Sequence, residues 1–345
     1  MRALVVGGAG FLGSHLVERL IGEGHTVDVV DDLSTGSLGN LAGARSHPSR
    51  ALSVHTLDGC SPALADLVSR RPPDVVYLLA PGVAADPDDR SVAERTLTSL
   101  LNVLDVARRT RLGKIVATVD ADDLHGEVPA REQPVKESWR TEPRTVGAVT
   151  ARAVVDLLAV HRERYGVEYT ALAMADVYGP RQGAGKVAEV LGDVVAHLER
   201  GAMLPEFDAR VQHDLVYVDD AVDALARAGA RGGGLLVNIG LGEPVSRRDV
   251  QRRLVRALTD AGSPVVRRGL AHGTRVGRPS RLSLSPIRAR IHLGWSPYTA
   301  LADGLAETMA WATAAGDEPP DRRLGEPDDA GGSREAPDDP GGLPT

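Results

Sequence analysis

The fold of this chain is decided near its N-terminus by the stretch Gly7-Gly8-Ala9-Gly10-Phe11-Leu12-Gly13. This stretch joins an apolar run at residues 3–6, which predicts a buried strand, to an amphipathic run at residues 11–22, which predicts a helix. Glycines at this junction permit a tight turn and leave room for a diphosphate, which would rest on the free N–H groups of the first helical turn. The stretch therefore predicts a dinucleotide-binding site.

A carboxylate at the end of the next predicted strand, residues 27–30, supports the same site. Asp31 lies roughly 20 residues further on, where dinucleotide-binding folds place an acidic residue against the ribose hydroxyls. Its charge would repel a 2′-phosphate. The expected cofactor is therefore NAD(H), with NADP(H) as the alternative.

Short apolar runs and helical patterns alternate through the first half of the chain. Further strands are expected at residues 75–79, 114–118, 169–174, 216–218 and 235–239, and further helices at 97–109 and 146–165. Such alternation indicates right-handed βαβ units. We predict an α/β fold: a Rossmann-type doubly wound parallel sheet with a smaller C-terminal substrate lobe and a disordered acidic tail.

The chain is expected to divide into three parts. Residues 1–176 form the predicted dinucleotide-binding domain, to which residues 213–245 return, while residues 177–212 and 246–314 form the substrate lobe. Residues 315–345 are rich in Pro, Gly, Asp and Glu. They hold too few apolar side chains to offset their ordering entropy, which predicts a disordered tail.

Composition limits the classes of function. The net charge is −7 over 345 residues, and the tail contributes most of it, with nine acidic against three basic residues. No basic surface for nucleic acid is expected. No stretch approaches the roughly 18 apolar residues that span a bilayer, and the start is not a signal peptide. These features predict a cytoplasmic protein with no membrane partner. The single cysteine, Cys60, fits no disulfide or zinc pattern, and no metal site is predicted.

Further motifs accompany the glycine stretch: VDDLSTG at residues 30–36, PDVVY at 73–77, VYGPRQ at 177–182, VYVDD at 216–220 and LGWSP at 293–297. With these motifs, residues 2–312 resemble the extended short-chain dehydrogenase/reductase family, the NAD-dependent nucleotide-sugar epimerases and dehydratases. The resemblance implies a set of cofactor-binding residues. They are Gly7, Gly10, Phe11, Leu12, Gly13, Asp31, Asp32, Asp58, Leu79, Ala80 and Thr150.

The resemblance also reveals a loss. The family moves protons with a Ser or Thr, a Tyr, and a Lys four residues after the Tyr. The register set by LHGE at residues 124–127 places Ala121, Val146 and Thr150 at these positions. Ala and Val cannot carry a proton, and a positioned acid or base is worth about 10²–10⁴-fold in rate. Ordinary turnover by the family's route is therefore not expected.

Other side chains are candidates for the proton chemistry. Asp122 and Asp123 stand where the sugar 4,6-dehydratases carry an Asp-Glu pair, and His125 follows closely. Adjacent residues at a strand end point to opposite sides, so we expect at most one of the two aspartates to face a substrate.

The implied substrate contacts have changed as well. His213 replaces an arginine that grips the nucleotide diphosphate in the family, and Asp176 replaces an asparagine. Arg281, or its neighbour Arg275 or Arg278, is the candidate for the second phosphate arginine.

Three functions are compatible with these residues. The favoured hypothesis is an NAD(P)H-dependent ketoreductase of secondary metabolism, related to antibiotic pathways, that acts on an activated small-molecule ketone. The proton would come from the substrate or from an acid foreign to the family. The alternatives are a nucleotide-sugar epimerase or dehydratase with relocated acid/base residues, and a catalytically inactive NAD-binding partner protein.

A homodimer is also expected. The predicted helices at 97–109 and 146–165 are apolar over more than one stripe, which indicates burial on two sides. The resemblance implies that these two helices pair with their copies in a dimer.

Overall fold

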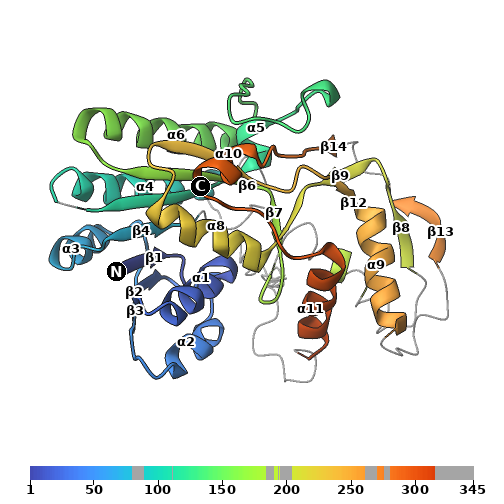
Figure 1. The fold of residues 1–345 in the computed structure, drawn as a ribbon, viewed down its shortest axis with the longest axis horizontal. Helices are drawn as coiled ribbons and strands as arrows, with labels where there is room; N and C mark the ends of the chain where they lie inside the picture. The colour runs from blue at the N-terminus through green and yellow to red at the C-terminus, as the bar shows by residue number, and fades with distance from the viewer. Residues whose placement is uncertain are drawn as a thin grey trace, which may run out of the picture.

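The computed structural model describes residues 1–79, 89–110, 112–183, 190–192, 194, 204–260, 270–275 and 280–314. Its centre is a sheet of seven parallel strands (Figure 1). These are β1 (Arg2–Val6), β2 (Thr26–Asp31), β3 (Leu52–Thr56), β4 (Val75–Leu78), β5 (Lys114–Asp120), β6 (Tyr169–Met174) and β11 (Leu235–Ile239). Their order is β11-β6-β5-β4-β1-β2-β3, so the direction of winding reverses between β1 and β4.

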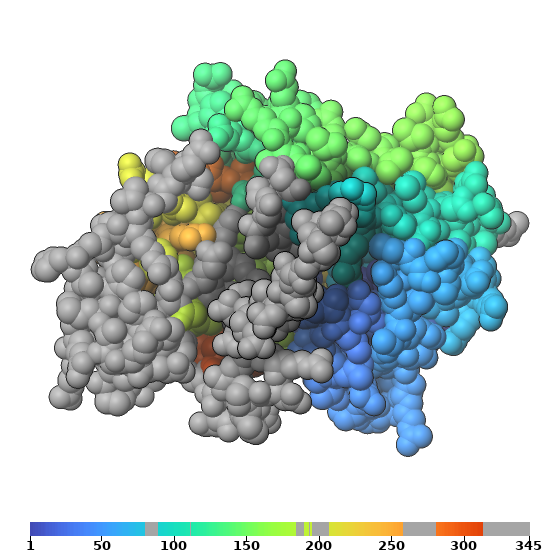
Figure 2. Space-filling model, turned by 180° about the vertical axis from the view of Figure 1, so that it is seen from behind, coloured from blue at the N-terminus to red at the C-terminus, as the bar shows by residue number. Residues whose placement is uncertain are grey.

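Helices cover both faces of this sheet. The layer of α3 (Pro62–Arg70), α4 (Arg90–Ala107) and α6 (Val146–Tyr165) lies on one face, and α1 (Phe11–Gly22) packs with α8 (Val218–Ala230) on the other (Figure 1). From behind, the first half of the chain, coloured blue to green, forms a continuous side of the molecule (Figure 2). A doubly wound sheet of this kind is the predicted Rossmann-type fold, and that prediction is confirmed.

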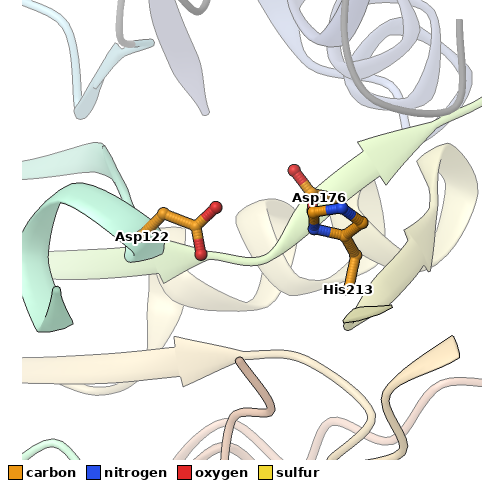
Figure 3. Close-up of side chains that lie close together, drawn as sticks. All are labelled: Asp122, Asp176 and His213. Atoms are coloured by element: carbon orange, nitrogen blue, oxygen red, sulfur yellow. The ribbon is translucent and has the colours of Figure 1, made fainter. Parts of the chain in front are cut away.

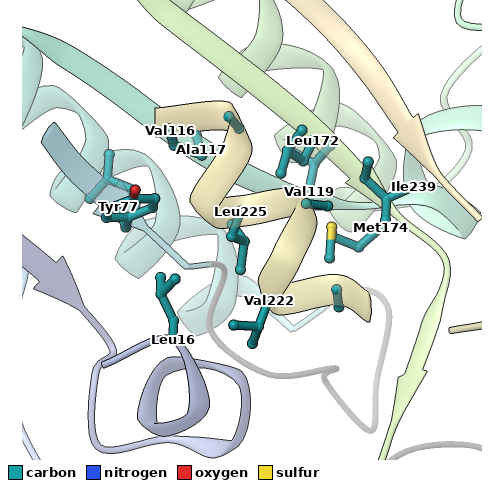
Figure 4. Close-up of a cluster of buried hydrophobic side chains, with 14 of the residues drawn as sticks. Leu16, Tyr77, Val116, Ala117, Val119, Leu172, Met174, Val222, Leu225 and Ile239 are labelled. Carbon is teal, nitrogen blue, oxygen red and sulfur yellow. The ribbon is translucent and has the colours of Figure 1, made fainter. Parts of the chain in front are cut away.

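The core lies between the sheet and its helices because the central strands are apolar on both faces, as is usual for parallel sheets. Every residue of β6 is buried. Leu16 of α1 and Val222 and Leu225 of α8 lie in one cluster with Val119 of β5 and other strand residues (Figure 4). This rigid centre holds the loops at the carboxyl ends of the strands.

Smaller elements complete the described chain. Short strands form three small sheets: β7 (Asp176–Tyr178) with β10 (Leu215–Tyr217); β9 (Val211–His213) with β12 (Val245–Ser246) and β14 (Ser280–Arg281); and β8 (Leu204–Phe207) with β13 (Leu270–Arg275). The remaining helices are α2 (Ala42–Ser46), α5 (Ala121–His125), α9 (Arg247–Asp260), α10 (Ile287–His292), α11 (Leu301–Ala314) and the 3-10 turns η1 (Leu38–Leu41) and η2 (Ala130–Glu132). Among the described residues, no helix is both long and apolar enough to span a membrane.

Most predicted elements are present and differ from the sequence only at their ends, whereas β3 and most of the short strands were not predicted. Helix α4 begins at Arg90, seven residues before the predicted start, and Val218 opens α8 instead of ending a strand. Strand β11 returns to the sheet beside β6. The predicted domain boundaries stay predictions, and the predicted tail at 315–345 lies outside the described residues.

Candidate functional site

The glycine loop after β1 has the geometry that a bound diphosphate requires. Gly7 has a φ of +80°, which favours glycine. A Cβ on Gly13 would lie 2.1 Å from the carbonyl oxygen of Gly7, so helix α1 can approach the loop only without a side chain there. No side chain caps α1 at Gly10. The N–H groups of its first turn are therefore available to an anion.

Asp31 at the end of β2 is fixed against this loop. Its carboxylate accepts the N–H of Ala9 at 2.8 Å and that of Leu33 at 2.9 Å. Each carboxylate oxygen can accept a further hydrogen bond, so the predicted role toward ribose hydroxyls fits this geometry. The residues present therefore fit a dinucleotide at the reversal between β1 and β4, where such folds bind their ligands.

The other predicted cofactor residues surround the same end of the sheet. Phe11 and Leu12 are partly buried in the first turn of α1. Asp32 follows Asp31, and Asp58 lies in the loop after β3, where its carboxylate accepts the N–H of Cys60. Leu79 follows β4, and Ala80 lies outside the described residues.

A second cluster lies past the ends of β5 and β6. One ligand atom each of Asp122, Asp176 and His213 lies within 4.8 Å of the others (Figure 3). Asp122 is exposed in α5, whereas Asp176 is partly buried and His213 is buried. All three line a cavity of about 10 Å³, enough for one water molecule, together with Ala121 and Leu282. The structure thus brings Asp122, a predicted proton donor, together with Asp176 and His213, both predicted substrate contacts.

Arg247, at the start of α9, determines which ring nitrogen of His213 accepts a hydrogen bond. Its Nε donates to Nε2 of His213 at 3.3 Å, and Nδ1 of His213 lies 3.1 Å from a carboxylate oxygen of Asp176. A guanidinium can only donate. Nε2 is therefore the accepting nitrogen, and Nδ1 carries the proton that is donated to Asp176. Sequence reasoning missed Arg247, because an arginine at the start of a helix has the pattern of a solvated charge.

This hydrogen bonding also bears on whether the cluster could hold a metal. Two carboxylates and an imidazole are donor types that divalent metals accept. However, the described arrangement keeps a proton on Nδ1 of His213 and a cation beside Nε2. In the described structure, Asp176 and His213 therefore form a hydrogen-bonded pair beside Asp122.

Two of the predicted proton donors lie away from this cavity. A Cβ on Gly147 would lie 2.7 Å from both carboxylate oxygens of Asp123, so Asp123 is directed at the start of α6. His125 is only 1% exposed and bonds the side-chain oxygen of Asn238 at 2.9 Å. Burial lowers the pKa of His125. Neither residue is placed to meet a substrate together with Asp122.

Arg281, the predicted phosphate arginine, lies in a strand that pairs with the strand carrying His213. Arg281 is exposed in β14 and pairs with Gln212, the neighbour of His213, in β9. The side chain of Arg275 and all of Arg278 lie outside the described residues. The role of Arg281 stays a prediction.

The chain is similar to a known protein family over most of its length. The model of the NAD dependent epimerase/dehydratase family matches residues 3–240. The chain belongs to this family. Within it, the chain is 34% identical to a UDP-glucose 4-epimerase of Mycolicibacterium smegmatis, over 90% of this chain and 97% of that protein. It is 31% identical to a dTDP-glucose 4,6-dehydratase of an Actinoplanes species, over 91% of this chain and 98% of that protein.

Solved structures of epimerases have the same fold. The UDP-glucose 4-epimerase of Thermotoga maritima with UDP-glucose matches with a TM-score of 0.78 and 27% identity, over 91% of this chain and 99% of that one. The Thermus thermophilus UDP-glucose 4-epimerase in complex with NAD matches with a TM-score of 0.76 and 28% identity, over 91% and 100%. The predicted cofactor, NAD, is confirmed at the level of the family.

The three positions at which the sequence resemblance predicts the family's proton-moving residues hold Ala121, Val146 and Thr150. Ala121 is buried at the end of β5 and Val146 is partly exposed at the start of α6. Thr150 is buried, and its hydroxyl donates to the carbonyl of Val146 at 2.8 Å. A hydroxyl bonded within its own helix is poorly placed to replace a lysine. The predicted contact of Thr150 with the cofactor stays a prediction.

Proposed function

We propose that this chain is an NAD-dependent nucleotide-sugar oxidoreductase of the epimerase or dehydratase type, in which Asp122 exchanges a proton with the substrate oxygen. The observation that supports the proposal is the convergence of Asp122, Asp176 and His213 within 4.8 Å. They line one cavity with Ala121, the position at which the family carries its Ser or Thr. Two carboxylates and an imidazole therefore lie beside Ala121, where the resemblance implies a Ser or Thr hydroxyl.

The chemistry needs one base on the chain. Oxidation of a sugar hydroxyl breaks an O–H and a C–H bond and leaves a ketone. Bound NAD⁺ supplies the hydride acceptor, and the hydroxyl proton passes to the Asp122 carboxylate. In an epimerase, return of the hydride to the carbon and of the proton to the oxygen restores an alcohol; in a dehydratase, the ketone remains and water is lost from the neighbouring carbons. A sugar hydroxyl is a very weak acid, so a positioned base is worth about 10²–10⁴-fold.

Asp122 suits this role better than Asp176. The N–H of His213 holds Asp176 as a hydrogen-bond acceptor, and Arg247 fixes that orientation. Asp122 is the exposed member of the cluster, so a substrate oxygen can reach it. Asp176 and His213 act as positioning residues.

The relatives favour this function over a ketoreductase. They are named as epimerases and dehydratases of UDP- and dTDP-sugars, and the chain matches them over about nine tenths of its length. The expectation of a ketoreductase in secondary metabolism finds no such support. The predicted cytoplasmic location also stays a prediction.

A panel assay tests the proposal. The protein with NAD⁺ is incubated with UDP-glucose, UDP-galactose and dTDP-glucose, and in parallel with NADH and aromatic ketones that carry a neighbouring phenol. We expect an epimer or a dehydrated ketosugar from one nucleotide sugar, identified by NMR. Reduction of a ketone alone would favour the ketoreductase. Absence of any product would favour the inactive NAD-binding protein.

We also propose that the active form is a homodimer built on α4 and α6, which pack side by side. Val149 and Val160 of α6 are 56% and 44% exposed, and Leu101 of α4 is 47% exposed. Val149→Glu is expected to shift the mass by light scattering from dimer to monomer, because a charge would be buried at the interface. Ile291→Glu, at a 70% exposed site in α10, is the control and should stay dimeric. A monomeric wild type would contradict the proposal.

A further inference from the structure

Arg95 links two parts of the cofactor end of the sheet. It belongs to α4, which follows β4, yet its Nη2 donates to Asp32 in the loop after β2 at 2.6 Å. The same nitrogen lies 3.4 Å from the hydroxyl of Ser34. Strand β1 separates β4 from β2 in the sheet. The Arg95 side chain therefore spans the point where the winding reverses.

Asp32 is held in place as the partner of Arg95. One carboxylate oxygen accepts the N–H and the hydroxyl of Ser34, at 3.0 and 2.6 Å, and the other accepts from Arg95. Burial alone would raise the pKa of Asp32, but the hydrogen bonds from Ser34 and the charge of Arg95 outweigh it and lower that pKa. The pair is therefore an ion pair at neutral pH.

Helix α4 is also attached to the loop after β3. The side-chain amide of Asn102 donates to the carbonyls of residues 59, 60 and 61, and Sγ of Cys60 lies 3.5 Å from the carbonyl oxygen of Arg95. Asp58 lies in this same loop and contributes, after burial, to raising the pKa of Cys60. Arg95 thus stands between the two loops that carry Asp31, Asp32 and Asp58.

We propose that Arg95 determines cofactor specificity, and that Asp32 withholds its guanidinium from a 2′-phosphate. Dinucleotide folds place the adenosine ribose at the end of the second strand, and a nearby arginine there accommodates a 2′-phosphate. Here Arg95 is already paired with Asp32. The carboxylates of Asp31, Asp32 and Asp58 together carry more negative charge than Arg95 can balance. A doubly charged phosphate is repelled, and NAD(H) is selected. Removing the Asp32 charge frees Arg95 to bind the phosphate.

A binding experiment without substrate tests this proposal. Asp32→Asn is expected to raise the ratio of NADPH affinity to NADH affinity by about tenfold or more, the scale of a charged hydrogen bond. The double variant Asp32→Asn/Arg95→Gln should lose that gain. Arg90→Gln is the matched control, since Arg90 lies in the same helix and pairs with Glu94 one turn away. Calorimetric titration with NADH and NADPH measures each affinity.

Three outcomes of this titration would contradict the proposal or the site on which it rests. A gain that survives in the double variant would show that loss of repulsion suffices, and would overturn the role of Arg95. An unchanged ratio of the two affinities in Asp32→Asn, or in Asp32→Ser if the first variant folds poorly, would overturn it as well. Wild-type protein that binds neither cofactor would contradict the site itself. The experiment measures binding and not turnover, so its result does not depend on whether the proposed reaction is correct.

Discussion

Asp122→Asn is expected to lower turnover of the nucleotide sugar by about 10²-fold or more, with NADH affinity within about threefold. An amide keeps the size of the side chain but cannot take a proton from a hydroxyl. Its exposed position also makes a loss of stability small. Steady-state rates and cofactor titration on the same preparations separate the two effects.

Asp123→Asn is the matched control for this prediction. It removes the neighbouring carboxylate, which is directed at Gly147 in α6 and not into the cavity. Its turnover should stay within about tenfold of wild type, below the range of a lost acid or base. Equal losses in both variants would show a general effect of charge. An unaffected Asp122→Asn would point to a proton from the substrate, as in the ketoreductase hypothesis.

Gly13→Ala is expected to weaken NADH binding by about 10²-fold or more. The new Cβ would lie 2.1 Å from the Gly7 carbonyl oxygen and 2.8 Å from the Cα of Gly8, both backbone atoms. The helix must therefore move away from the loop, and several charged hydrogen bonds to the diphosphate, each worth about 1.5–3 kcal/mol, would be lost. Fluorescence titration of NADH measures the change, and circular dichroism checks the fold.

Gly22→Ala separates a local effect from a general intolerance of α1 to substitution. Gly22 ends the same helix, and a Cβ there meets nothing within 4 Å. Its NADH affinity should equal that of wild type. If Gly13→Ala also binds normally, the diphosphate does not rest on this loop.

The sequence predicted the elements that have a strong pattern. Helices α1 and α6 and strands β6 and β11 have the predicted bounds, because each is a long apolar or amphipathic run. Strand β3 was missed. It is an edge strand whose residues are only partly buried, so it shows no continuous apolar run. The short strands of the small sheets contain too few residues for a periodicity to show.

The cofactor loop could be predicted, but the second cluster could not. The loop is one contiguous stretch of sequence, and its glycines can be recognised because they permit a tight turn and leave room for a diphosphate. By contrast, Asp122, Asp176, His213 and Arg247 come from four separate segments. In the sequence, Asp176 and His213 are two separate changes among the implied substrate contacts, whereas in the structure they form one hydrogen-bonded pair. Such a pairing depends on tertiary packing and has no local signal.

The most direct measurement is a crystal structure of the Asp122→Asn variant with NAD and the nucleotide sugar identified by the panel assay. The variant is suited to holding substrate unreacted. We expect the side chain at 122 to lie about 2.6–3.2 Å from the sugar hydroxyl to be oxidised, which is hydrogen-bond distance. Asp176 and His213 would keep their contact beside it. A sugar hydroxyl bonded to another group, with residue 122 facing solvent, would contradict the relocation of the proton chemistry to Asp122.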